Sequence, residues 1–172
     1  MRTYTVRPAE HGDVESIASV AIQAWNRTYG SIYPRDLIAR FVSRAYSSDS
    51  LHISISNDSG RPVRLFHVAL DSYGNIVGYF QSRPEANGYT SLEILRIYAL
   101  PESVGTGVGT ALLNHLFLTC PEVATLSAWV EEKNVIGRKF YENHGFKCSD
   151  ERDEEFFGHS TLQKKYTLSR HA

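Results

Sequence analysis

Residues 101–113 combine residue types that can bind a phosphate group. An apolar, β-rich run over residues 92–100 ends at Pro101, and a helical pattern of apolar residues starts at position 108 and extends to Leu118. Between them, alternate glycines remove side chains where a ligand must approach, and the N–H groups and dipole of the first helical turn attract an anion. We therefore expect a phosphate-bearing ligand against Gly105, Thr106, Gly107, Val108, Gly109 and Thr110.

Two common phosphate motifs fit this loop poorly. A P-loop needs a lysine directly after its last glycine, where this chain has Thr110. A Rossmann fingerprint spaces its glycines as G-x-G-x-x-G, whereas here the third glycine comes one residue early. Taken alone, the segment is also compatible with a flexible turn into a helix.

A second polar segment lies downstream, at residues 130–146. Its pattern predicts the end of a strand and then a short helix with Asn134 as the N-cap and Gly145 in the left-handed position after the last turn. Asn134 and Tyr141 are seven residues apart, so a helix places them on one face.

Together these two segments resemble the GNAT superfamily of acetyl-CoA-dependent N-acetyltransferases. The matching patterns are the loop and helix at 101–113 and Asn134-x-x-Gly137-x-x-Phe140-Tyr141-x-x-x-Gly145-Phe146. The resemblance implies an α/β, three-layer fold with a mixed, mostly antiparallel central sheet and helices on both faces. It also implies that coenzyme A binds the glycine loop, and that its pantetheine arm contacts Asn134, Tyr141 and the backbone of Ile97, Tyr98 and Ala99.

The chain departs from the family pattern at two loop positions. Val104 stands where the family has Gln or Arg, and Thr106 stands where many members carry a basic residue. Backbone amides can still bind pyrophosphate. An alternative is therefore a coenzyme A-binding module without transferase turnover.

Acetyl transfer needs a neutral amine and a proton for the departing thiolate. By position in the family, Tyr141 is the candidate general acid, because a phenol with a pKa of about 10 is protonated at working pH. Glu93 is the candidate base, acting directly or through water. The alternative role of Tyr141 is that of a core aromatic residue. The alternative for Glu93 is a charge on an exposed strand face. Asn134 binds pantetheine, caps its helix, or does both.

The acceptor is predicted from two further segments. Residues 24–33 are similar to the same region of PaiA-like spermidine/spermine acetyltransferases and supply Trp25, Tyr29 and Tyr33. A loop over residues 149–157 is expected to present Asp153, Glu154 and Glu155, which would attract cations, although such runs are commonly solvated surface. The expected acceptor is a primary amine, with a polyamine as the specific candidate. The alternative acceptors are a peptide N-terminus and an aminoglycoside, whose acetylation would use the same catalytic residues.

Composition predicts one globular domain over residues 1–172. The 42% hydrophobic and 22% charged residues are ordinary for such a protein, and a formal charge of −1 gives no general attraction to nucleic acid or membrane. The N-terminus shows no signal peptide, which favours a cytoplasmic location, and a homodimer is compatible with the sequence. Cys120 and Cys148 are expected to be free thiols, His67 and His115 to be packed or at the surface, and no metal spacing is present.

The expected elements alternate in type along the chain. A strand at 3–7 precedes two helices, the first capped by Asp13 and the second starting at Pro34. Residues 51–56 are ambiguous between strand and loop. Further strands are expected at 63–70, 76–81, 92–99, 123–130, about 146–149 and 161–168, with helices from residue 108 and in the 134–145 segment.

Overall fold

A mixed sheet forms the framework of the chain. The computed structural model describes residues 2–170, and its strands are ordered β1-β2-β3-β4-β5-β7-β6. Strands β4 (Ser91–Ala99) and β5 (Thr125–Glu131) are parallel, whereas β1 with β2, β2 with β3, β5 with β7 and β6 with β7 are antiparallel. The predicted mixed, mostly antiparallel α/β fold is confirmed.

The chain divides into two compact units. Unit 1 contains Met1–Gln81 and Arg96–Pro121, and unit 2 contains Ser82–Leu95 and Glu122–Ala172. Strands β3 (Ile76–Pro84) and β4 run through both. No helix within residues 2–170 is long and apolar enough to cross a membrane.

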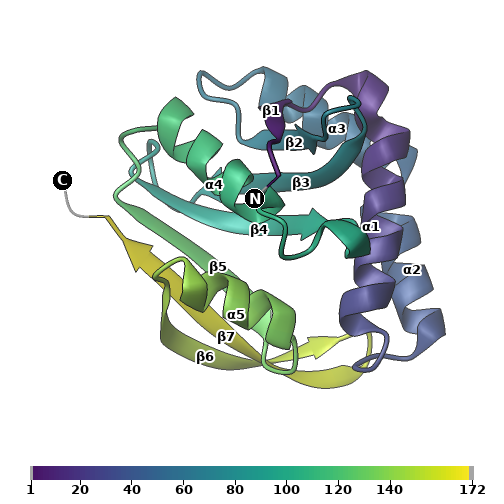
Figure 1. Cartoon of the computed structure of the whole chain (residues 1–172). Helices are drawn as coiled ribbons and strands as arrows, with labels where there is room; N and C mark the ends of the chain where they lie inside the picture. Colours follow the sequence, from purple (N-terminus) through teal and green to yellow (C-terminus); the bar gives the residue numbers. More distant parts are fainter. Residues whose placement is uncertain (1, 171–172) are drawn as a thin grey trace. The chain divides into compact units, whose positions relative to one another are not determined.

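Unit 1 packs four helices with short strands. Strands β1 (Thr5–Pro8) and β2 (Phe66–Leu70) pair with Val6 opposite Ala69. Helix α1 (Val14–Tyr29) contacts α2 (Arg35–Ala45) and α3 (Ser48–Ser59), and Figure 1 shows α1 and α2 side by side. Helix α4 (Val108–Thr119) contacts β1 and β2, and the ring of its His115 meets that of His67 on β2 at 4.8 Å.

Helix α3 corrects the ambiguous interpretation of residues 51–56. Leu51, Ile53 and Ile55 alternate with polar residues, which imitates a strand. The helix buries Leu51 and Ile55, four residues apart on one face, and leaves Ile53 62% exposed. Its N-cap is Ser47, whose Oγ accepts a hydrogen bond from the N–H of Ser50 at 3.2 Å.

Two smaller expectations in unit 1 are also corrected. Asp13 is the N-cap residue of α1, but its side chain makes no capping hydrogen bond to this helix: its carboxylate accepts the N–H of Glu10, the residue before the 3-10 turn His11–Asp13, at 2.8 Å and pairs with Arg7 at 2.7 Å. Leu118 belongs to the predicted apolar pattern of α4, yet it is 80% exposed. The buried face of α4 is instead formed by Val108, Leu112, Leu113 and Leu116.

Unit 2 joins one helix to a layer of strands, to which the end of β3 also contributes. The first part of β4, β5, β7 (His159–Ser169) and β6 (Lys147–Phe156) lie in that order, and Figure 1 shows α5 (Val135–Asn143) against β5 and β7. The prediction of a loop at 149–157 is wrong, because these residues continue β6 and the chain turns at Phe157 and Gly158. Both turn residues have positive φ, 48° and 82°, as a two-residue hairpin turn matching the strand twist requires.

Candidate active site

The glycine loop has the geometry that its sequence predicts. After β4, a 3-10 turn over Pro101–Ser103 leads to Gly105 and Gly107, which adopt φ values of 78° and 104°. These left-handed conformations are open mainly to glycine. Gly107 is the N-cap of α4, and the Ala111 N–H donates to the Gly107 oxygen at 2.9 Å across this junction. The intervening N–H groups, at 108–110, lie at the positive end of the helix dipole.

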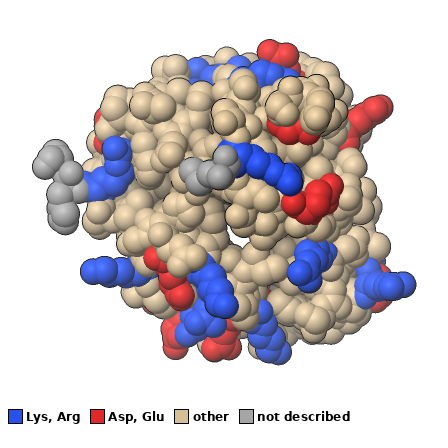
Figure 2. Space-filling view, in the orientation of Figure 1, with Lys and Arg blue, Asp and Glu red and all other residues tan. Residues whose placement is uncertain are grey.

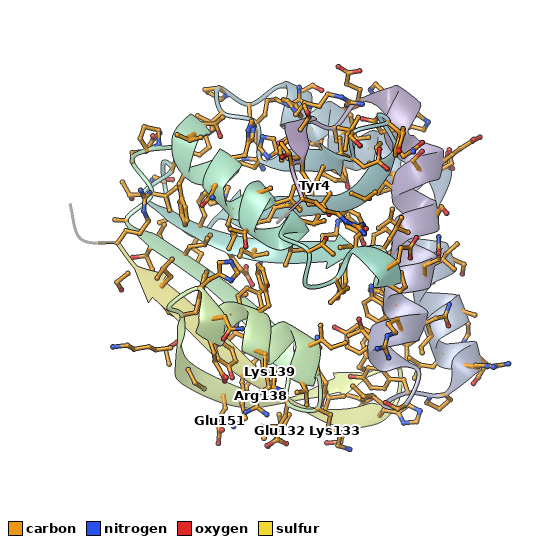
Figure 3. All side chains as sticks on the ribbon, viewed as in Figure 1. Tyr4, Glu132, Lys133, Arg138, Lys139 and Glu151 are labelled. Atoms are coloured by element: carbon orange, nitrogen blue, oxygen red, sulfur yellow. The ribbon has the colours of Figure 1, made fainter. Side chains whose placement is uncertain are left out.

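Two hydroxyl groups fix the shape of this loop. The hydroxyl of Tyr4, the residue that Figure 3 labels, lies 2.5 Å from Thr106 Oγ1, and this Oγ1 donates to the Ser103 carbonyl at 2.6 Å. The Arg2 N–H also reaches the Thr106 oxygen, at 3.4 Å. Thr106 therefore stabilises the loop internally, at a position where many members of the resembled family carry a basic residue. Tyr4, which lies 102 positions away along the chain, was not predicted to contact this loop.

Close packing of α4 on the sheet depends on Gly78 in β3. A Cβ atom there would lie 2.6 Å from Val108 Cγ1 and 3.0 Å from the Tyr98 oxygen, so a larger residue would displace the helix start. This contact places the backbone of Tyr98 and Ala99 beside the first turn of α4. The predicted pantetheine strand and pyrophosphate loop are thus neighbours within unit 1.

The three aromatic residues predicted to line the acceptor site form one cluster. Trp25, Tyr29 and Tyr33 are each no more than 8% exposed, and the Tyr29 ring lies 4.2 Å from Trp25 and 5.7 Å from Tyr33. The Tyr29 hydroxyl also lies 3.0 Å from that of Tyr98. Burial is the main cause that raises the pKa of Tyr98. The side chain of Tyr98 was not among the predicted contacts, because only its backbone was assigned a role.

Helix α5 confirms the local structure predicted around Asn134. The Oδ1 atom of Asn134 accepts a hydrogen bond from the Gly137 N–H at 2.8 Å. A Cβ atom on residue 137 would lie only 2.7 Å from Nδ2 of Asn134, so the side-chain amide leaves no room for one. This explains the Asn-x-x-Gly spacing. At the other end, Gly145 has φ 83°, and the N–H groups of Gly145 and Phe146 bond to the carbonyls of Glu142 and Tyr141.

Tyr141 lies on the side of α5 that faces the sheet. It is 6% exposed, with its ring 5.1 Å from Phe146 and 6.0 Å from Tyr166. The Tyr166 hydroxyl donates to Glu142 at 2.8 Å and accepts from Arg138 at 3.1 Å. These contacts hold the phenol ring of Tyr141 in a defined position, which both a general acid and a core aromatic require.

Glu93 occupies a partly covered position on β4. Its Oε2 accepts Nε of Arg83 at 2.8 Å, and the Nη2 atom of the same guanidinium is 2.7 Å away. The Glu93 side chain is 14% exposed and that of Arg83 is 58% exposed. Across the parallel pair, Glu93 is in register with Ser127. The carboxylate is therefore positioned by a guanidinium, a partner that the sequence analysis did not identify.

The acidic residues of 150–155 lie on an exposed edge strand with opposite charges close by. Arg152 contacts Glu154 at 3.2 Å, and Lys164 contacts Glu151 at 3.5 Å. Figure 2 shows blue and red side chains interspersed at the lower edge, where Figure 3 labels Glu132, Arg138, Lys139 and Glu151. On this face the charge is mixed rather than uniformly acidic.

The predicted site residues fall into both units. Unit 1 holds Trp25, Tyr29, Tyr33, Ile97, Tyr98, Ala99, Gly105, Thr106, Gly107, Val108, Gly109 and Thr110. Unit 2 holds Glu93, Asn134, Tyr141, Asp153, Glu154 and Glu155. Within the described part of the chain, no three His, Cys, Asp or Glu side chains are grouped to hold a metal ion, and Cys120 and Cys148 are free thiols.

Comparison with known proteins decides the family. The profile described as "Acetyltransferase (GNAT) domain" matches residues 62–148, half of the chain. The chain belongs to the GNAT acetyltransferase family. This match includes the glycine loop and Tyr141, and it extends through parts of both units. Membership makes the protein an acyltransferase of the GNAT type.

Curated GNAT relatives cover most of the chain. A spermidine N(1)-acetyltransferase from Thermoplasma acidophilum is 26% identical over 164 residues, 94% of this chain and 96% of that protein. The uncharacterised N-acetyltransferase YuaI from Bacillus subtilis is 31% identical over 137 residues, 76% of this chain and 73% of its own.

Solved GNAT structures share the fold. The PaiA N-acetyltransferase from Thermoplasma acidophilum, solved in complex with coenzyme A, has a TM-score of 0.82 at 23% identity and covers 98% of this chain and 99% of its own. The acetyltransferase yncA from Salmonella typhimurium, solved with acetyl-CoA, has a TM-score of 0.74 at 18% identity, covering 99% and 96%.

Proposed function

We propose that the protein transfers the acetyl group of acetyl-CoA to a primary amine of a polyamine. The observation that carries this proposal is the glycine loop, which presents the start of α4 in a chain of the GNAT family. The similarity to a spermidine N(1)-acetyltransferase over 94% of the chain supports the choice of acceptor. We treat both units as parts of one catalytic domain, because the family match extends through both.

Coenzyme A is proposed to bind at the glycine loop and along β4. The N–H groups at 108–110 would hold its pyrophosphate, while the backbone of 97–99 would pair with pantetheine and polarise the thioester carbonyl. Gly107→Glu places a carboxylate there, so calorimetry should show coenzyme A binding lost while the thermal melt remains cooperative. Gly74→Glu is a matched control, since Gly74 also has positive φ but lies in an open turn. Equal affinity in both variants would remove the loop from the proposal.

The chemistry is an attack of a neutral amine on the thioester. The nitrogen forms a bond to the acetyl carbon, the carbon–sulfur bond breaks, and the sulfur leaves as a thiolate. Glu93, directly or through water, would accept the proton that the amine loses. Tyr141 would donate its hydroxyl proton to the thiolate and regain one from solvent. Asn134 would help to hold the pantetheine while it caps α5.

The acidic residues of β6 are proposed to steer cationic acceptors. Asp153, Glu154 and Glu155 are exposed, so their attraction is long-range and is screened over about 8 Å at physiological salt. Consequently kcat/KM for spermidine should fall with ionic strength while kcat changes little. Neutralising all three should flatten that dependence. If kcat/KM of this variant depends on ionic strength as strongly as that of the wild type, the three residues are only solvated surface.

A panel of amines tests the reaction itself. Thiol release from acetyl-CoA should be fastest with spermidine and spermine, and slower with a monoamine, an aminoglycoside and a peptide with a free N-terminus. Release with a peptide alone would indicate an N-terminal acetyltransferase. Coenzyme A binding without release for any amine would indicate a binding module, which the departures at Val104 and Thr106 allow.

A further inference from the structure

One face of the unit 2 sheet carries an aromatic ring among charged groups. Ser127, Trp129 and Glu131 alternate along β5, so their side chains share a face, whereas Tyr166 on β7 faces α5. Trp129 is opposite Lys165 and Glu131 is opposite Gln163 in the register with β7. Trp129 is partly exposed, and its direct neighbours along the strand are Ala128 and Val130.

The ring of Trp129 already contacts two cations of its own chain. The guanidinium carbon of Arg152 lies 4.0 Å from the ring centroid, and the ammonium of Lys165 lies 5.8 Å from it. Both distances are within the range of a cation–π interaction. The geometry therefore demonstrates that this face accepts cations.

The two cations differ in how firmly they are held. Lys165 pairs with Glu85 at 3.2 Å, and this carboxylate also accepts hydrogen bonds from Ser91 at 2.9 Å and Ser127 at 3.1 Å. Burial opposes ionisation of Glu85, but these hydrogen bonds lower its pKa overall. Arg152 projects from the exposed strand β6 and is half-exposed, and its carboxylate contact is Glu154, also half-exposed, at 3.2 Å. An exposed ion pair of this kind is weak, so Arg152 is the cation that can leave.

Charge balance defines what would replace it. Among the described residues, Glu85, Glu131, Asp150 and Glu154 share this face with Lys165 and Arg152, and beside Ser127 the carboxylate of Glu93 is paired with Arg83, so negative charges outnumber positive ones. When Arg152 turns into solvent, the ring keeps one contacting cation, Lys165, and the excess of negative charge increases. A ligand that restores the balance must carry a positive charge, and a methylene chain on it would cover the ring edge.

We propose that the face of Trp129 binds an ammonium group of the acceptor that is not being acetylated, and that Arg152 occupies this face until the acceptor displaces it. The inference rests on the proposed amine acetylation and adds the residues that select a second positive charge. Arg152 thereby competes with the acceptor, and Trp129 is a specificity-determining residue.

Steady-state kinetics with spermidine and propylamine test the role of Trp129. Trp129→Leu should raise KM for spermidine about two- to thirty-fold, the range of a single cation–π contact, with kcat little changed. KM for propylamine, which has no second ammonium, should change less than about twofold. Trp129→Phe keeps an aromatic ring, so its KM for spermidine should lie between those of the wild type and Trp129→Leu. Equal effects on both amines would overturn the inference.

Arg152→Gln tests the competition. Removing the resident cation should lower KM for spermidine, and this gain should disappear in the Trp129→Leu background. Lys164→Gln is the matched control, because it removes the same charge from a neighbouring position on β7 whose side chain pairs with Glu132 and Glu151 instead. An equal decrease of KM in the Lys164 variant, or a decrease that persists without the Trp129 ring, would indicate a general charge effect and overturn the inference.

Calorimetry with spermidine alone separates this inference from the proposed function. If spermidine is acetylated but Trp129→Leu leaves its KM unchanged, the inference fails and the function stands. If no amine is acetylated, the proposed function fails. Spermidine binding that Trp129→Leu weakens about two- to thirty-fold then still supports the cation site, whereas absent binding, or binding that the variant leaves unchanged, overturns it.

Discussion

Acid should destabilise the protein through His67, which lies under α4. His67 is 1% exposed, and no hydrogen-bond partner for its Nδ1 is found among the described residues. Burial, with smaller contributions from His115 and Arg64, lowers the pKa of His67 from 6.5 to about 3. Burial also lowers the pKa of His115. His67 is therefore neutral in the folded protein at any pH near neutrality.

The sign and size of the effect follow from linkage. The unfolded chain takes up a proton on this histidine below pH 6.5, whereas the folded chain does not until about pH 3, so stability falls as pH decreases through that window. At 1.36 kcal/mol per pH unit, His67 alone should remove about 2 kcal/mol of unfolding free energy between pH 7.5 and pH 5. Above pH 7 it contributes almost nothing.

Urea unfolding at pH 5, 6 and 7.5 measures this contribution. His67→Leu has a similar volume and no charge, so its stability should depend on pH less steeply than that of the wild type by about 2 kcal/mol over this range. The difference between the two slopes is the readout, because packing changes shift the variant equally at each pH. Parallel profiles for wild type and His67→Leu would refute the reasoning.

Three further predictions concern the candidate active site. Tyr4→Phe removes the hydroxyl that holds Thr106, so calorimetry should show coenzyme A affinity reduced about two- to tenfold, the value of one hydrogen bond; unchanged affinity would make the contact incidental. Tyr141→Phe keeps the ring packing but loses the proton donor, so kcat should fall about 10²–10⁴-fold with little change in acetyl-CoA affinity, and a kcat within about twofold of wild type would leave a core aromatic. Glu93→Gln should lower kcat/KM at pH 7 about 10²-fold and displace the basic limb of the pH profile upwards, whereas Arg83→Gln keeps the carboxylate and should retain most activity.

Residue spacing within single segments was sufficient for the local parts of the site. The glycines at 105 and 107 need positive φ, and the cap of Asn134 and the stop at Gly145 are fixed by bonds to residues at most five positions away. Such short-range geometry can be predicted from the types of neighbouring residues, because glycine alone adopts the left-handed region without a steric cost. The sequence therefore predicted the loop, the helix start and the short helix of α5.

Where local signals conflict, tertiary packing decided the outcome. The alternation at 51–55 suggests a strand, but one helical face of Leu51 and Ile55 is buried and Ile53 is left at the surface. The run of charges at 150–155 suggests a loop, but pairing with β7 makes it an edge strand, with Glu151 opposite Lys164. Neither result could be read from the segment itself, since a strand needs a partner and a helix needs a face to bury.

The sequence by itself determined the family resemblance, the geometry of the glycine loop and the residue types proposed for the reaction, because each depends on residues close together along the chain. Only the tertiary structure brought Tyr4 to Thr106, Arg83 to Glu93, and Arg152 and Lys165 to the ring of Trp129. The residues of each such contact are 10 to about 100 positions apart. Strand register and the packing of elements set these contacts, and no spacing rule in the sequence encodes them.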